Sequence, residues 1–130
     1  MSLDVLNHIE LPVTDAERSR QFYEAALSPL GVALVVSTVA AAHGGARYGL
    51  GRAGYPSFWI HSEPGIRSAI HVAFTAGDRA AVRAFHEAAL ANGGTENGPP
   101  GIRERYHTHY FAAYILDPDG NNIEAVCQAV

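Results

Sequence analysis

Four side chains with the chemistry of metal ligands occupy equivalent places in the two halves of this 130-residue sequence: His8, His61, His71 and Glu124. An offset of 63 residues (71 − 8 = 63) places His8 on His71, and the same offset places His61 on Glu124. Two neutral imidazoles and one carboxylate are a usual ligand set for a divalent first-row metal that keeps open positions for water or substrate. The sequence therefore predicts a metal site of His8, His71 and Glu124, with His61 as a candidate fourth ligand.

The two halves match beyond these positions. The segment HIELPVTDAERSRQFYEAALSPLG, which starts at His8, aligns without a gap on HVAFTAGDRAAVRAFHEAALANGG, which starts at His71. Identical pairs that do not depend on alanine content are Asp15/Asp78, Phe22/Phe85 and Gly31/Gly94. Such self-similarity indicates two copies of one structural unit. We expect a single domain over residues 1–130, with one module at about 3–63 and a second at about 66–130.

Strand patterns decide which way the candidate ligands point. Apolar residues alternate along 9–13, so His8 and Glu10 lie on the face opposite the apolar one. The same alternation places three further side chains on the sheet face away from the helices: His61, His71 and Glu124. The four candidate ligands therefore line the non-helical faces of strands, which would form a cleft if those faces curved together.

A helix is expected after the first strand of each half. Thr14 and Glu17 have capping-box spacing and mark the start of an amphipathic helix that ends near Gly31. In the second half the helix begins near Asp78. Its expected apolar stripe consists of Val82, Phe85, Ala89 and Leu90.

The stretch TENGPPGIRERYHTH, residues 95–109, is rich in Gly and Pro. It is too irregular for a regular element and too long for a plain connector, so we interpret it as a loop that could close over a substrate. Five side chains on or beside it could serve in proton transfer: Tyr106, His107, His109, Tyr110 and Tyr114. We take Tyr106, Glu10 and Glu124 as candidate catalytic groups, without assigning the general base among them.

The end of the chain predicts a hairpin, because YFAAYIL and NIEAVCQAV are strand-like runs joined by Asp117-Pro118-Asp119-Gly120. Cys127 lies in the last of these runs and is the only cysteine, which excludes an internal disulfide framework. We expect it to be a buried strand residue rather than a nucleophile.

Composition excludes several function classes. The formal charge is −4, and all nine cationic residues are Arg. The absence of a basic stripe argues against nucleic acid as a partner, and the absence of Lys excludes Schiff-base chemistry and a Walker-type phosphate loop. No apolar run is long enough to span a membrane, and no N-terminal secretion signal is evident, so we expect a cytoplasmic protein.

Three segments resemble the vicinal oxygen chelate superfamily, which includes glyoxalase I, extradiol dioxygenases, fosfomycin-resistance proteins and bleomycin-binding proteins. They are LNHIELPVTDAERSRQFYEAAL, AIHVAF and FAAYILDPDGNNIEAV, of which the last is the most specific. The resemblance implies an α+β fold of two paired βαβββ modules that form a curved mixed sheet around a metal cleft. It also implies a divalent ion, Zn, Ni, Mn or Fe, held by the family ligand positions that His8, His71 and Glu124 match.

One departure from the family pattern concerns His61, because glyoxalase I has a glutamate at that place and uses it in proton transfer. A metal-dependent lyase or isomerase acting on a small substrate through two neighbouring oxygens is favoured, and a ring-cleaving dioxygenase is less favoured at this length. The alternatives are a drug- or metabolite-binding resistance protein without catalysis and a purely structural metal. We expect a homodimer, with the modules paired either within one chain or between two.

Overall fold

The computed structural model describes residues 5–40, 45–65, 70–106 and 108–129. Within these ranges each half of the chain forms one βαβββ unit, as expected from the repeat. The first unit contains β1 (Ile9–Val13), α1 (Ala16–Leu27), a short 3₁₀ helix η1 (Ser28–Leu30), β2 (Ala33–Ala40), β3 (Gly45–Gly51) and β4 (Phe58–Ser62). The second contains β5 (His71–Thr75), α2 (Arg79–Ala91), β6 (Thr95–Ile102), β7 (Phe111–Leu116) and β8 (Asn122–Cys127).

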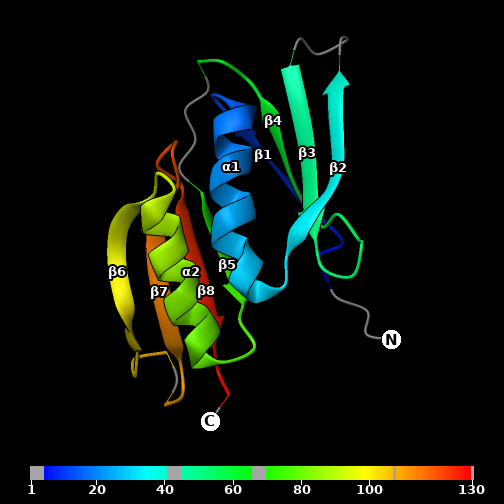
Figure 1. Ribbon diagram of the computed structural model, residues 1–130. Helices are drawn as coiled ribbons and strands as arrows, with labels where there is room; N and C mark the ends of the chain where they lie inside the picture. Colours follow the sequence, from blue (N-terminus) through cyan, green and yellow to red (C-terminus); the bar gives the residue numbers. More distant parts are fainter. Residues whose placement is uncertain (1–4, 41–44, 66–69, 107, 130) are drawn as a thin grey trace.

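The strands form two four-stranded sheets of the same topology. Their orders are β1-β4-β3-β2 and β5-β8-β7-β6. In each sheet the first strand pairs in parallel with the last strand of its unit, and the other pairings are antiparallel. The helices α1 and α2 pack against each other on the same side of the strands (Figure 1). The opposite faces of the two sheets are therefore left for the candidate ligands.

The helix starts repeat across the two halves. Asp15 and Asp78, 63 positions apart, are the N-caps of α1 and α2, and their carboxylates accept hydrogen bonds from the amides of Arg18 and Ala81. The expected capping role of Thr14 is wrong, because α1 begins one residue after Asp15. The first helix ends as expected, since η1 leads into Gly31 with a left-handed φ of 79°.

Edge-to-face aromatic contacts run through the core. The ring centroids of Tyr23 and Phe58 lie 4.9 Å apart, and those of Phe58 and Phe74 lie 5.2 Å apart. Because Phe58 belongs to β4 and Phe74 to β5, this row of rings joins the two units. The helix stripes are buried as expected except at Leu90, which is 40% exposed and lies outside the core.

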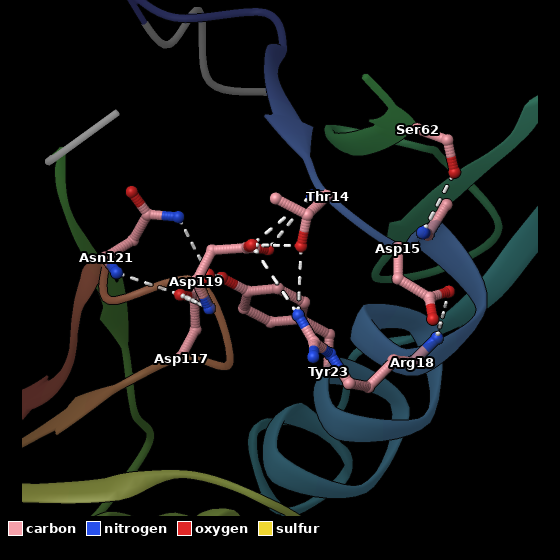
Figure 2. A network of polar contacts seen from close by, with 9 residues as sticks. Thr14, Asp15, Arg18, Tyr23, Ser62, Asp117, Asp119 and Asn121 are labelled. Carbon is pink, nitrogen blue, oxygen red and sulfur yellow. Dashed lines mark hydrogen bonds and ion pairs between the residues drawn. The ribbon is translucent and has the colours of Figure 1, made fainter. Parts of the chain in front are cut away.

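Polar contacts join the β7–β8 turn to α1 and to the residues just before it, and they form a second connection between the units. We call it the inter-unit clasp: Thr14, Tyr23, Asp117 and Asp119. The Tyr23 hydroxyl donates to Asp117 Oδ2 at 2.5 Å, and the Thr14 hydroxyl donates to Asp119 Oδ1 at 2.5 Å. Figure 2 shows both aspartates reaching from the turn toward α1. The expected hairpin is confirmed, with Gly120 at φ 90° in its turn.

The clasp predicts a loss of stability in alkali. Burial, followed by the negative charge of Asp117, raises the pKa of Tyr23 well above its ordinary value of 10.0. The unfolded chain therefore releases this proton before the native state does, and stability falls as the pH rises above about 10. We expect a Tyr23→Phe variant to remove a slope that approaches roughly 1.4 kcal/mol per pH unit as the pH rises from 10 to 11. Urea unfolding across this range measures it, and equal slopes in both proteins would contradict the assignment.

The expectation of an irregular stretch after α2 is wrong for residues 95–102. They form β6, the edge strand of the second sheet, which pairs with β7 through a register that shifts on either side of Gly98. The strand pattern is not visible in the sequence because Gly and Pro occupy the positions of the register shifts. At these positions the backbone does not have to donate an N–H to β7, and no side chain has to pack. The described residues between β6 and β7, 103–106 and 108–110, belong to no helix or strand.

Two further expectations concern the rest of the chain. Cys127 is buried in β8, as expected. None of the helices in the described part of the chain is long and apolar enough to cross a bilayer.

Candidate metal site

The second sheet brings His71 and Glu124 together. His71 Nε2 lies 2.9 Å from Glu124 Oε1, and the Tyr110 hydroxyl donates to Glu124 Oε2 at 2.5 Å. The pair can form because β5 and β8 run in parallel and Ala73, with its small side chain, is the register partner of Glu124. Glu124 is only 2% exposed. We call His71, Tyr110, Tyr114 and Glu124 the second half-site.

A pocket of about 410 Å³ opens over the second half-site. Its lining consists of His71, Tyr106, Tyr110, Tyr114, Asn122 and Glu124. The rings of His71 and Tyr114 stack with centroids 6.2 Å apart. Burial, with the nearby Glu124 carboxylate, raises the pKa of both Tyr110 and Tyr114. Both phenols are therefore neutral hydrogen-bond donors at neutral pH.

The first sheet carries a different cluster at the corresponding place: Glu10, Arg47 and His61, which we call the first half-site. Glu10 accepts two hydrogen bonds from Arg47, at 2.7 and 3.1 Å, and its Oε2 lies 2.6 Å from His61 Nδ1. The Arg47 guanidinium stacks on Trp59, 3.9 Å from the ring centroid. These groups border a pocket of about 570 Å³ that is separate from the one over the second half-site.

The surroundings of Glu10 bear on its candidate role as a base. The hydrogen bond from Arg47, together with its charge and the contact with His61, lowers the pKa of Glu10. A general base works best with a pKa close to the operating pH. Because its pKa is lowered, Glu10 is a weak proton acceptor. As a carboxylate it holds the side chains of Arg47 and His61 in place.

His8 makes no hydrogen bond or ion pair with another candidate ligand among the described residues. It is exposed and directly precedes β1, and its Nδ1 lies 2.8 Å from the Asn7 side-chain oxygen. Across the described residues, no three His, Cys, Asp or Glu side chains come close enough to hold a metal ion. A single chain thus brings together His71 and Glu124 but not the expected set of three ligands.

The tyrosines beside the second half-site differ in their contacts. Tyr106 is 56% exposed at the rim of the second pocket, and its ring centroid lies 5.1 Å from that of Tyr110. Tyr110 rather than Tyr106 makes the hydrogen bond to Glu124. The repeat contains a signal for this, because the 63-residue offset places Tyr110 on Arg47, which binds the acid of the first half-site. His107 lies outside the described residues.

A family model and the solved structures similar to this chain point to the same protein family. A family model described as Glyoxalase/Bleomycin resistance protein/Dioxygenase superfamily matches residues 5–125. The fold is similar to that of a glyoxalase/bleomycin resistance protein from Albidiferax ferrireducens T118, with a TM-score of 0.75 and 32% identity over 95% of this chain and 98% of that one. No curated protein matches the sequence.

More distant structures share the fold. Glyoxalase I from Zea mays gives a TM-score of 0.73 at 24% identity, covering 94% of this chain and 45% of the maize chain. This chain therefore spans less than half of that protein's length. A glyoxalase-related enzyme from Fulvimarina pelagi gives a TM-score of 0.68 at 20% identity, covering 96% of this chain and 88% of that one.

Proposed function

This chain belongs to the glyoxalase/bleomycin resistance protein/dioxygenase superfamily, and from that premise we propose that it holds a divalent metal ion and acts on a small substrate bound through two neighbouring oxygens. The observation that carries the proposal is the His71–Glu124 pair, which lies in a pocket and joins an imidazole nitrogen to a buried carboxylate. Burying a carboxylate is costly unless a partner or a cation compensates its charge.

The donors present fit such an ion. Imidazole nitrogen and carboxylate oxygen suit Zn, Ni, Mn and Fe alike, so the donor set does not select among them. In the first half-site, Glu10 sits 2.6 Å from His61 Nδ1. Ligand histidines usually have a carboxylate beside their second ring nitrogen, and this proximity of Glu10 to Nδ1 supports His61 as the fourth ligand through Nε2.

The remaining ligands come, in this proposal, from a second copy of the chain. A homodimer with two-fold symmetry would place His8 and His61 of one copy against His71 and Glu124 of the other, and would contain two such sites. The exposure of His8 and the separate pockets of the two half-sites within one chain support this arrangement.

The ion, when bound, would supply a Lewis acid for the two substrate oxygens. The chain's own residues would orient the substrate, because Tyr114 and Tyr110 present neutral phenols beside Glu124. Tyr106 at the pocket rim and Glu124 are the candidates for moving a proton, and Glu10 would hold His61 in place. A lyase or isomerase is the favoured reaction class.

A non-catalytic binding protein for a drug or metabolite is the second candidate. Two features favour it: both oxygens of Glu124 already have partners within the chain, and Glu10 is a weak base. Both pockets would then serve to enclose a ligand.

Metal content tests the proposal directly. We expect the purified protein, loaded with excess divalent metal and then desalted, to retain about one ion per chain, and His8→Ala to lose it. Elemental analysis by mass spectrometry measures both. His86→Ala is a matched control that should keep its metal, because His86 lies on α2 and pairs with Glu96 outside both half-sites. Full metal content in His8→Ala would contradict the ligand assignment.

A further inference from the structure

We propose that Tyr110 is a positioning residue for Glu124, holding one carboxylate oxygen so that the other is presented to the metal beside His71. The inference rests on the proposed metal site and adds a residue that acts through a ligand. Its starting point is that each oxygen of Glu124 has its own partner: Oε2 accepts from the Tyr110 hydroxyl at 2.5 Å, and Oε1 lies 2.9 Å from His71 Nε2.

Two contacts at different oxygens fix the plane of a carboxylate. A single contact would leave the group free to rotate about the bond to its side chain, whereas the Tyr110 hydrogen bond selects one orientation. Because Glu124 is only 2% exposed, water has little access to replace the phenol. The phenol itself is held at its backbone, since the Tyr110 carbonyl accepts from the Arg103 amide at 2.7 Å.

The internal repeat supports this role independently. Tyr110 corresponds to Arg47 at the 63-residue offset (110 − 47 = 63). Arg47 donates two hydrogen bonds to Glu10, and Glu10 contacts His61, the repeat equivalent of Glu124. In both halves, the residue at this position therefore donates to a carboxylate of its half-site, although Glu10 and Glu124 are not equivalent in the repeat. Arg47 reaches His61 through Glu10, whereas Tyr110 binds Glu124 directly.

Neighbouring tyrosines have other contacts. Tyr114 is the cross-strand partner of Glu124, but its ring stacks on the His71 imidazole. Tyr106 packs against the ring of Tyr110 and is more than half exposed. Tyr48→Phe is the matched control, because it removes a phenol that donates to a carboxylate, that of Glu17, outside both half-sites.

Titration with Co(II) tests the inference, because the visible spectrum of this ion reports its ligands as well as its affinity. Loss of a partner that orients a metal ligand typically weakens metal binding about 10- to 100-fold. We expect Tyr110→Phe to show a loss in this range and a changed absorption spectrum at saturation. Tyr48→Phe should keep the wild-type spectrum and an affinity within about 2-fold. Thermal unfolding of each apo variant verifies that it is folded.

A double variant separates positioning from a general structural effect. If Tyr110 acts through Glu124, Tyr110→Phe should add little to the loss already caused by Glu124→Gln. Additive losses, or a wild-type spectrum and affinity in Tyr110→Phe, would overturn the role of Tyr110 while leaving the metal site in place. Absence of Co(II) binding by the wild-type protein would instead overturn the proposed function, and the role of Tyr110 with it.

Discussion

Mixing the His8→Ala and His71→Ala variants is expected to restore metal binding that neither variant has alone. In the proposed homodimer each site takes His8 from one copy and His71 from the other. A mixed dimer then contains one site that lacks both histidines and one site in which both are intact. Random exchange makes half of the dimers mixed, so the recovered metal should approach about a quarter of the wild-type content per chain.

The experiment requires subunit exchange, achieved by unfolding and refolding the two variants together, followed by size-exclusion chromatography and elemental analysis of the dimer fraction. A mixture of His71→Ala with Glu124→Ala is the matched control. These two ligands belong to the same half-site, where they lie 2.9 Å apart, so every site in that mixture lacks at least one of them. Restoration in the control, or none in the first mixture, would contradict a site shared between copies.

Replacing Asp117 by Ala is expected to cost about 3 to 5 kcal/mol of unfolding free energy, because it leaves several buried donors without partners. The Asp117 carboxylate accepts from the Tyr23 hydroxyl, the amides of Asp119 and Asn121, and the Asn121 side chain, at 2.5 to 2.9 Å. Tyr23 and Asn121 are both fully buried, so water cannot replace the lost acceptor without opening the structure.

Urea unfolding followed by circular dichroism measures this loss. Asp78→Ala serves as the comparison, since it removes a carboxylate that accepts one exposed amide at the start of α2 and should cost about 1 kcal/mol. If Asp117→Ala costs no more than Asp78→Ala, the clasp contributes little to holding the β7–β8 turn on α1.

Much of the fold could be predicted because the repeat and the local patterns agree. Each half shows the same alternation followed by the same helix, and Asp15 and Asp78 cap their helices as equivalent residues should. The strand β6 was not predicted because its register shifts around Gly98 interrupt the two-residue alternation on which a strand prediction depends. Thr14 was predicted to cap the first helix, whereas its hydroxyl donates to Asp119. The two residues are 105 positions apart, so no local pattern indicates this contact.

The candidate site was predictable in its residue types and faces, but not in its assembly. Alternation places Glu124 and His71 on one face, and parallel pairing of β5 with β8 brings them together. Whether His8 joins them depends on how whole units pack, and side-chain packing between units leaves no periodic signal in a sequence. The contact between Tyr110 and Glu124 also joins two separate segments of the chain. The sequence indicates it only through the repeat, which places Tyr110 on Arg47.

The strand β6 has a consequence for self-association. An edge strand usually exposes a row of unpaired N–H and C=O groups onto which the strand of another molecule can add, and this is a common route to aggregation. Pro99 and Pro100 lie within β6 and have no N–H to offer, and the bulges beside them bend the strand out of line. The second sheet is thus protected against extension through β6.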